Sequence, residues 1–341
     1  MNIEFIKSKV ELNKILQLYY QKHDKIFFIT QQSIIEKNTT VQNIINKKYL
    51  YISEENEQCK SIIEYQKIIN FLHTNGCNKN SLIIAIGGGT ITDLVGFVSG
   101  TYMRGIAMLS VPTTLLGMVD ASIGGKTALN FEYSRNLIGL YYNPISIIIY
   151  SNFIQTLNKN EIINGLAEII KYALILDVKL FNQLENSMDD ILNLKNEKLL
   201  NKIIKNCIKH KNNIVQKDQF DNNIRNILNF GHTVGHALES YYDFKMAHGL
   251  AVLYGMLSAS YLSYQQQLLS ENDYNRIKML INTFNLSKLN IKDPKKIMQF
   301  IDADKKNIRN KLNYILLQNI GNACIKKDFN KDLILQTIKF L

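Results

Sequence analysis

The chain has 341 residues and 46% of them are apolar, which allows two domains or one large α/β unit and excludes a disordered protein. Four scattered cysteines without a C-x-x-C pair, no secretory signal and no apolar run of about 20 residues favour the cytoplasm over export or a membrane. The net charge of +11 favours an anionic partner. The basic residues do not form a single stripe with interleaved aromatic residues, so nucleic-acid binding is not favoured.

The first part of the chain alternates between strand-like and helical patterns. Residues 25–30 read as a buried strand and residues 61–74 as an amphipathic helix, with the polar segment 53–60 leading into that helix. Residues 81–86 form a short apolar run that is typical of a strand in a parallel sheet.

Three glycines, Gly87, Gly88 and Gly89, follow this run directly, and a helical pattern begins after them. Glycine lets the backbone approach a phosphate, and the N–H groups and dipole of a helix start attract it. The pattern is not the G-x-G-x-x-G fingerprint, so a dinucleotide site and a structural turn both remain open.

A further strand is expected over residues 107–111, and residues 145–150 form the strand that closes this α/β half. Between them, residues 124–127 read Gly-Gly-Lys-Thr, like the end of a P-loop. Asp120 stands where that motif needs its first glycine, so an ATPase is not favoured, although Lys126 can still hold a phosphate.

The pattern becomes helical from about residue 158. Glu168 and Lys171 lie three apart, on one helix face, and could be a surface ion pair. Because Glu168 interrupts an otherwise apolar helix, we expect it to point into a site. The remaining predicted elements are helices over residues 179–217, 234–242, 249–269 and 271–285 and a strand over residues 313–321.

Three of the six histidines, His232, His236 and His248, lie close together in the sequence. One carboxylate, Glu168, and two of these imidazoles would give zinc three ligands and an open position. Spacing alone favours His232 with His236, since residues four apart share a helix face. A nucleotide site in the first half and a metal site in the second predict a substrate cleft between domains.

These motifs together resemble the 3-dehydroquinate synthase family over most of the chain. The matching blocks are GGGTITD at 87–93, VPTTLL at 111–116, VDASIGGKT at 119–127, GLAEIIKY at 165–172, NFGHTVGH at 229–236, HG at 248–249 and DKK at 304–306. The resemblance implies a Rossmann-like α/β domain over residues 1–157 and a mostly α-helical domain over residues 158–341. It also implies NAD, a divalent metal that is zinc or alternatively cobalt, and a homodimer.

The family reaction converts 3-deoxy-D-arabino-heptulosonate 7-phosphate to 3-dehydroquinate and phosphate. It proceeds through transient oxidation by NAD, phosphate elimination, re-reduction and an intramolecular aldol closure. The resemblance therefore implies a lyase whose small-molecule partner is a phosphorylated sugar acid.

The resemblance also implies a role for individual residues. It makes Glu168, His232 and His248 the metal ligands and His236 a proton shuttle, in place of the pair that spacing favours. Residues implied near the reacting part of the substrate are Asp120, Lys171, Lys211 and Asn229. Arg225 and Lys211 suit the substrate carboxylate, and Lys126, Asn136, Lys305 and Lys306 suit its phosphate. Arg104 is expected to reach a neighbouring subunit's site. The implied NAD residues are Glu57, Lys60, Gly88, Gly89, Asp93, Thr113, Thr114, Lys126, Arg135 and Thr156.

Several positions depart from the family pattern. Gln31 replaces an acid that holds the adenosine ribose, Asn56 a glycine, Arg135 a lysine and Leu250 an acid beside the metal ligands. Gln219 and Asp221 stand where glutamates are common. We expect these changes to affect affinity and rate rather than the class of reaction.

Three other functions compete with this interpretation. A sister sugar-phosphate cyclase would not need the carboxylate-binding pair Arg225 and Lys211. An NAD- and metal-dependent polyol dehydrogenase would not need the lysine cluster. A basic scaffold or nucleic-acid binder would bind DNA in a salt-sensitive way and hold no metal.

Overall fold

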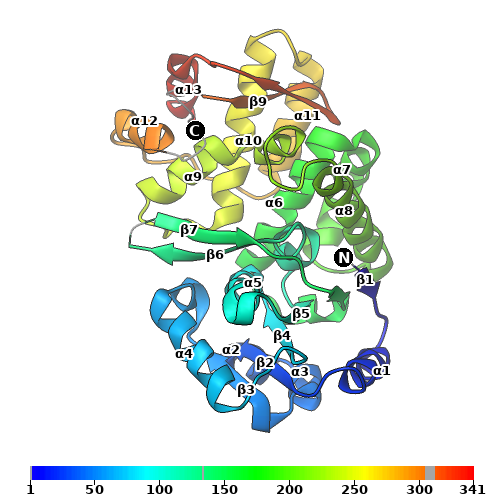
Figure 1. Cartoon of the computed structure of the whole chain (residues 1–341). Coiled ribbons are helices and arrows are strands. Elements are labelled where there is room, and N and C mark those ends of the chain that lie inside the picture. Colours follow the sequence, from blue (N-terminus) through cyan, green and yellow to red (C-terminus); the bar gives the residue numbers. More distant parts are fainter. Residues whose placement is uncertain (1, 133, 304–311) are drawn as a thin grey trace. The chain divides into compact units, whose positions relative to one another are not determined.

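The computed structural model describes residues 2–132, 134–303 and 312–341 of the chain (Figure 1). The chain divides into two compact units, Met1–Glu161 and Ile162–Leu341. Among the described helices, none combines the length and the apolar character that a membrane crossing requires. The predicted phosphate ligands Lys305 and Lys306 lie outside the described residues.

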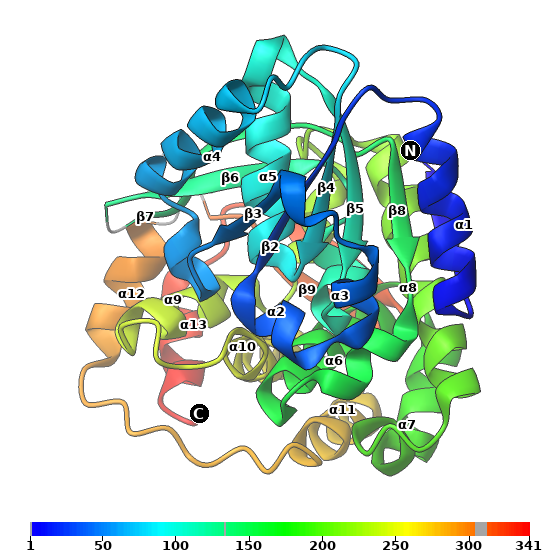
Figure 2. The same ribbon diagram turned by 90° about the horizontal axis from the view of Figure 1, so that it is seen from below.

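The first unit is built on a six-stranded parallel sheet with the strand order β1-β8-β5-β4-β2-β3 (Figure 2). The strands are β1 (Asn2–Phe5), β2 (Ile26–Gln31), β3 (Leu50–Ser53), β4 (Leu82–Gly87), β5 (Ala107–Pro112) and β8 (Ser146–Ile149). The predicted strands over residues 25–30, 81–86, 107–111 and 145–150 are therefore confirmed. Their apolar runs are continuous because both faces of a parallel sheet are buried.

Helices α4 (Ile62–Thr74) and α5 (Gly89–Thr101) pack on one face of this sheet (Figure 2). Ser61 caps α4, because its hydroxyl accepts a hydrogen bond from the backbone N–H of Glu64 at 3.1 Å. The core beneath joins Ile68 of α4, Val95 of α5 and Ile83 of β4, all fully buried. The unit also contains α1 (Lys9–Tyr20), α2 (Gln32–Lys37), α3 (Thr39–Ile44), 3₁₀ turns η1 (Lys47–Tyr49), η2 (Asn56–Cys59), η3 (Tyr102–Arg104) and η5 (Ser151–Thr156), and the π-helical turn η4 (Gly117–Ala121).

A separate antiparallel hairpin, β6 (Lys126–Phe131) and β7 (Ser134–Tyr141), packs against α5. The sequence did not predict this hairpin. Gly124 and Gly125 have φ angles of +99° and +69° and lead into β6, whereas a P-loop leads into a helix. Residues 124–127 are therefore not the end of a P-loop, in agreement with the sequence analysis.

The second unit is mainly helical, as expected. Its elements are α6 (Lys159–Leu176), α7 (Val178–Leu192), α8 (Glu197–Lys217), η6 (Ile224–Asn229), α9 (His232–Tyr241), α10 (His248–Gln265), α11 (Glu271–Asn282), α12 (Pro294–Ala303), α13 (Lys331–Ile338) and the hairpin β9 (Tyr314–Asn319) and β10 (Asn322–Lys326). The predicted helical segment 179–217 is two helices, because Asn196 caps a new helix through the backbone N–H of Leu199 at 3.0 Å.

Candidate active site

Helix α6 carries two buried charged side chains in its apolar centre. Glu168 is 1% exposed and Lys171 is 2% exposed, and the Lys171 ammonium donates a hydrogen bond to Oε2 of Glu168. A buried charge of this kind needs a partner, and here each supplies the other. Both side chains are buried, so they are not the surface ion pair that the sequence left open.

Glycines bring α9 close to α10. Gly231 precedes His232 with φ +77°, a left-handed conformation that glycine adopts without strain. A Cβ on Gly255 would lie 1.9 Å from the carbonyl oxygen of Gly231, so the two backbones touch. As a result, His232, at the start of α9, is held next to α10.

A second glycine contact places the start of α10 beside α6. A Cβ on Gly249 would lie 2.6 Å from Cα of Asn164, and the Gly249 N–H donates to Oδ1 of Asn164 at 2.7 Å. His248, the residue before, is thereby held near Glu168.

Three side chains converge as a result. Nε2 of His232 lies 3.3 Å from Oε1 of Glu168, and Nε2 of His248 lies 3.6 Å from the same oxygen. The three candidate ligand atoms all lie within 4.8 Å of one another. This Oε1 is buried and makes no hydrogen bond with any residue in the described part of the chain.

The other ring nitrogens fix the orientation of both imidazoles. Nδ1 of His232 lies 3.1 Å from the carbonyl oxygen of Phe230, which can only accept, so Nδ1 carries the hydrogen. Nδ1 of His248 lies 3.5 Å from Oε2 of Glu239, a carboxylate that is 5% exposed. Both rings therefore direct Nε2 towards Glu168, as metal-binding histidines do when a carbonyl or carboxylate holds the other nitrogen.

The electrostatics of this cluster fit a cation. Burial lowers the pKa of His232 to about 4, so its Nε2 presents a lone pair to a carboxylate oxygen. Burial opposes ionisation of Glu168, yet the Lys171 ammonium and His232 hold the pKa of its carboxyl well below the usual value. Burial alone would lower the pKa of His248, but the carboxylates of Glu168 and Glu239 raise it to about 10. One carboxylate and two imidazoles are a donor set that suits zinc or a similar divalent metal.

His236 lies beside this cluster but outside the three-ligand set. Its ring centroid is 5.2 Å from that of His232 and 6.3 Å from that of His248. The structure thus brings together Glu168, His232 and His248, the set implied by the family resemblance. Spacing along one helix favoured His232 with His236 instead.

Two further predicted substrate residues of this unit are buried cations. Lys211 is 6% exposed on α8, and Arg225 is 3% exposed in η6. The Asp218 carboxylate accepts hydrogen bonds from the backbone N–H groups of Asn222 (3.0 Å), Asn223 (2.7 Å) and Arg225 (3.0 Å). Asp218 therefore shapes the loop that carries Arg225. Asn229, also predicted, ends η6.

In the first unit, the glycine turn lies at the carboxyl end of the parallel sheet. Gly88 is the N-cap of α5 and has no side chain to occupy the first N–H groups of that helix. A Cβ on Gly88 would lie 3.0 Å from Cγ2 of Thr114, and the Thr113 N–H donates to the carbonyl of Gly87 at 2.9 Å. Gly88, Gly89, Thr113 and Thr114 thus lie at adjacent strand ends, where α/β sheets bind nucleotides.

Other predicted NAD residues form a polar network next to this turn. The buried Lys60 ammonium donates to Oδ2 of Asp93 at 2.7 Å and to Oδ1 of Asn136, and lies 3.8 Å from Oε1 of Glu57. Asn136, predicted to bind phosphate, therefore lies among residues predicted to bind NAD. Asn130 completes the network, because its Nδ2 donates to Oε1 of Glu57 at 3.0 Å.

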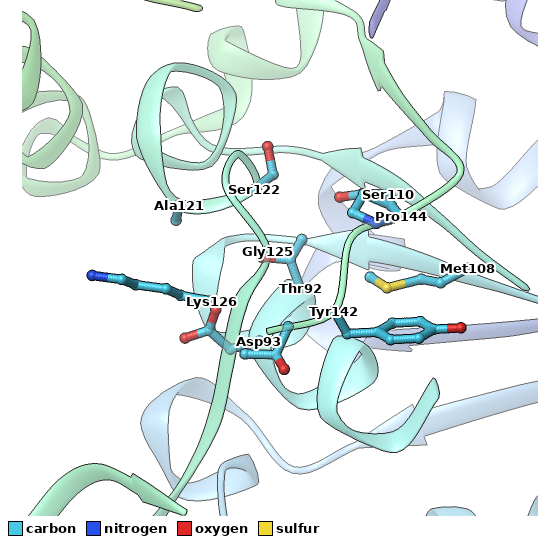
Figure 3. A pocket seen from close by; sticks show the side chains of 11 residues that line it. Thr92, Asp93, Met108, Ser110, Ala121, Ser122, Gly125, Lys126, Tyr142 and Pro144 are labelled. Carbon is cyan, nitrogen blue, oxygen red and sulfur yellow. The ribbon is translucent and has the colours of Figure 1, made fainter. Parts of the chain in front are cut away.

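A small hollow with room for about one water molecule lies beside Asp93 and Lys126 (Figure 3). Ser110, Met108, Tyr142 and Pro144 line its other side. The side chain of Lys126 extends away from these residues in Figure 3. It is exposed at the start of β6.

The remaining predicted residues of this unit lie on four different elements. Asp120 lies in η4. Thr156 ends η5, and its hydroxyl accepts from Nδ2 of Asn38 at 3.1 Å. Arg135 is on β7. Arg104 is exposed, with φ +59°, at the end of η3.

Three of the departures from the family pattern can be interpreted in the structure. Gln31 is buried at the end of β2, and its amide donates to the carbonyl of Glu54 at 2.8 Å, a bond that a carboxylate could not make. Asn56 has φ +53°, the left-handed region that favours glycine and that asparagine tolerates best among the others. Leu250 brings no acid to His248, but Glu239 places a carboxylate there from α9.

Sequence reasoning gave no role to Glu239, Asn130 or Asp218, although it singled out Gln219 and Asp221 beside Asp218. Glu239 carried a usable signal, because it follows His232 by seven residues and so lies on the same face of α9. Asn130 gave no signal, since its contacts come from a hairpin that was not predicted.

The chain combines an α/β unit that has a glycine turn at the start of α5 with a helical unit that has a Glu-His-His cluster. Solved sugar-phosphate cyclases share this fold. A solved 2-deoxy-scyllo-inosose synthase, complexed with carbaglucose-6-phosphate, NAD+ and Co2+, matches with a TM-score of 0.86 and 25% identity over 99% of this chain and 96% of that one. A 2-epi-5-epi-valiolone synthase from Streptomyces hygroscopicus, with NAD+ and Zn2+ bound, has the same fold, with a TM-score of 0.89 and 22% identity over 99% and 96%.

The sequence matches narrow this class. Residues 50–164 match the family model described as 3-dehydroquinate synthase N-terminal, and residues 165–307 the one described as 3-dehydroquinate synthase C-terminal. The 3-dehydroquinate synthase of Clostridium tetani is 37% identical over 98% of this chain and 88% of its own. That of Blochmanniella floridana is 39% identical over 84% and 80%. The chain belongs to the 3-dehydroquinate synthase family.

Proposed function

We propose that the protein converts 3-deoxy-D-arabino-heptulosonate 7-phosphate to 3-dehydroquinate and phosphate, the reaction of its family. The observation that carries the proposal is the Glu168 cluster: a buried carboxylate oxygen faces Nε2 of His232 at 3.3 Å and of His248 at 3.6 Å. Lys171 holds the second oxygen of the same carboxylate. This arrangement supports a metal-dependent enzyme.

We propose that Glu168, His232 and His248 hold a divalent metal, zinc or cobalt, and that the turn at Gly88 and Gly89 holds the diphosphate of NAD. When bound, NAD accepts and returns a hydride and the metal polarises an oxygen as a Lewis acid. The α5 N-terminus offers backbone N–H groups to the diphosphate. The other proposed NAD residues are Glu57, Lys60, Asp93, Thr113, Thr114, Lys126, Arg135 and Thr156.

The protein's own side chains would orient the substrate and move its protons. His236, beside the ligand cluster, is the proposed proton shuttle for the reacting hydroxyl, because an imidazole can exchange protons near neutral pH. Lys171 and Asn229 would hold oxygens of the sugar near the metal, and Asp120 of η4 is a further proposed substrate residue. Lys126 and Asn136 would bind the phosphate.

Two buried cations of the second unit support a substrate that is a sugar acid. Lys211 and Arg225 are both almost fully buried, and a buried guanidinium and ammonium suit a carboxylate. A sister cyclase is the second candidate, because the matched inosose synthase is complexed with carbaglucose-6-phosphate, whose name indicates no carboxylate. The substrate carboxylate therefore distinguishes the two.

We further propose a cytoplasmic homodimer. The four cysteines, all within the described residues, form no disulfide, which is consistent with a reducing compartment. Arg104 is exposed at the end of η3, where it could reach a second subunit. Sedimentation of the purified protein tests the dimer, and an R104A variant tests whether the second subunit's site needs this arginine.

Phosphate release tests the reaction. The protein is incubated with NAD, zinc and either 3-deoxy-D-arabino-heptulosonate 7-phosphate or glucose 6-phosphate, each with a chelated control. We expect zinc-dependent release from the sugar acid, formation of 3-dehydroquinate and no accumulation of NADH. Release from glucose 6-phosphate alone would favour a sister cyclase, and steady accumulation of NADH would favour a polyol dehydrogenase.

A further inference from the structure

The hairpin β6–β7 contains an irregularity beside the proposed nucleotide site. Leu129 pairs with Ile138, but the register shifts before Phe131 pairs with Ser134, so β7 has extra residues opposite Asn130. Such a bulge re-aims side chains and is common next to active sites. Here the extra residues include Arg135 and Asn136, which are both proposed ligands of the phosphate or of NAD.

Asn130 holds this bulge with both ends of its amide. Its Oδ1 accepts a hydrogen bond from the backbone N–H of Asn136 at 2.9 Å, and its Nδ2 donates to Oε1 of Glu57 at 3.0 Å. Its backbone N–H donates to the carbonyl of Lys60 at 2.7 Å. One residue therefore connects the bulge to η2 and to the loop that carries Lys60.

The contacts of Asn136 show what this connection achieves. Asn136 has φ +52°, a left-handed conformation that costs an asparagine free energy unless its surroundings hold it. The hydrogen bond from its N–H to Asn130 stabilises that conformation. The Lys60 ammonium donates to Oδ1 of Asn136, so the amide's Nδ2 faces away from Lys60 and can donate to an anion.

We propose that Asn130 is a positioning residue that sets the NAD side chains Glu57 and Lys60 and the phosphate side chain Asn136 in a single arrangement. The inference rests on the proposed function, which supplies those two ligands. Asn130 itself would touch neither ligand, and it would act through Glu57, Lys60 and Asn136.

Asparagine suits this position because both contacts are needed at once. Oε1 of Glu57 accepts from a donor, and the N–H of Asn136 donates to an acceptor, so the residue between them must supply one of each. Asn130→Ala removes both contacts. Asn130→Asp keeps the acceptor for Asn136 but replaces the donor with an oxygen that repels the Glu57 carboxylate. The two substitutions therefore separate the two arms of the contact.

The test measures two affinities by titration calorimetry on the full-length, zinc-loaded protein. The first is the Kd for NAD+, and the second is the Kd for inorganic phosphate on the NAD+-saturated protein. Asn80→Ala is the matched control, because Asn80 hydrogen-bonds Asp24 at 2.8 Å just before β4, at the end of the strand opposite Gly88. Thermal unfolding of each variant reports on stability.

For Asn130→Ala we expect the Kd for NAD+ and the Kd for phosphate both to rise, each about tenfold for one or two lost hydrogen bonds. For Asn130→Asp we expect the NAD+ value to rise at least as much, while the phosphate value stays within about twofold of wild type. Asn80→Ala should change neither Kd.

Two results would overturn the inference. One is a wild-type NAD+ affinity in Asn130→Ala. The other is an equal loss of both affinities in the alanine and aspartate variants together with a large fall in Tm, which would indicate only a structural role. A wild-type protein that binds no NAD+ would instead refute the proposed function, and the inference with it.

Discussion

Replacement of Glu239 by glutamine tests how the metal cluster is supported. Glu239 is 5% exposed, and its carboxylate lies 3.5 Å from Nδ1 of His248. The amide of Glu239→Gln has nearly the same shape but no charge, so it can still contact the ring without raising its basicity. We expect His248 to become a weaker ligand while the fold is retained.

The geometry sets the size of this effect. Loss of a carboxylate that holds a metal-binding histidine weakens metal binding about 10- to 100-fold. Because 3.5 Å is long for such a hydrogen bond, we expect the lower end, about tenfold or about 1.4 kcal/mol.

Competition with a chromogenic zinc chelator measures this change, and the visible absorption of the cobalt-loaded protein reports whether the coordination is retained. Glu185→Gln is the matched control, because Glu185 pairs with Arg276 at 2.7 Å and takes no part in the cluster. Zinc affinity within twofold of wild type in Glu239→Gln, or an equal loss in Glu185→Gln, would refute the reasoning.

Three further predictions concern other parts of the site. His232→Ala should lose zinc and activity together, whereas His236→Ala should keep zinc and lose rate. Metal analysis of the two variants checks this. A metal-free His236→Ala would instead favour His232 and His236 as the metal ligands, as their spacing alone suggests. Asp218→Asn should raise KM for the sugar acid more than it lowers kcat, because the loop that carries Arg225 loses a charged acceptor worth about 1–3 kcal/mol. Burial opposes ionisation of Asp218, but three backbone N–H groups lower the pKa of its carboxyl. The contribution of this carboxylate to the free energy of unfolding is therefore present above about pH 4 and is lost as the pH falls through the lowered pKa. When Tm is measured against pH in acid, Asp218→Asn should lose less stability than wild type. Gln31→Glu should lower Tm and leave NAD+ binding no tighter, since the new carboxylate would face the carbonyl that the amide now satisfies; tighter binding by calorimetry would contradict this.

The sequence predicted the parts of the fold in which local pattern and tertiary structure agree. The apolar run that becomes β4, the glycines after it and the start of α5 were all legible, because each follows from local physics. The hairpin β6–β7 was not, because its pairing depends on contacts with α5 and η2 far along the chain.

The metal cluster shows the same limit more sharply. His232 and His236 share a face of α9, and nothing in their spacing shows that Nε2 of His248 lies 3.6 Å from Oε1 of Glu168. That approach depends on Gly249 touching Asn164 and on Gly255 touching Gly231, which are contacts between helices. Only the family resemblance carried this information before the structure did.

The glycine contacts around the cluster also bear on how this chain can tolerate sequence change. Backbone presses on backbone where α9 meets α10 and where α10 meets α6. The spacing of the three ligand atoms therefore depends little on the size of the surrounding side chains. We expect substitutions among the leucines and isoleucines nearby to leave this spacing unchanged, provided that Gly231, Gly249 and Gly255 are retained. The three glycines thus fix the distances between the helices that carry the candidate metal ligands.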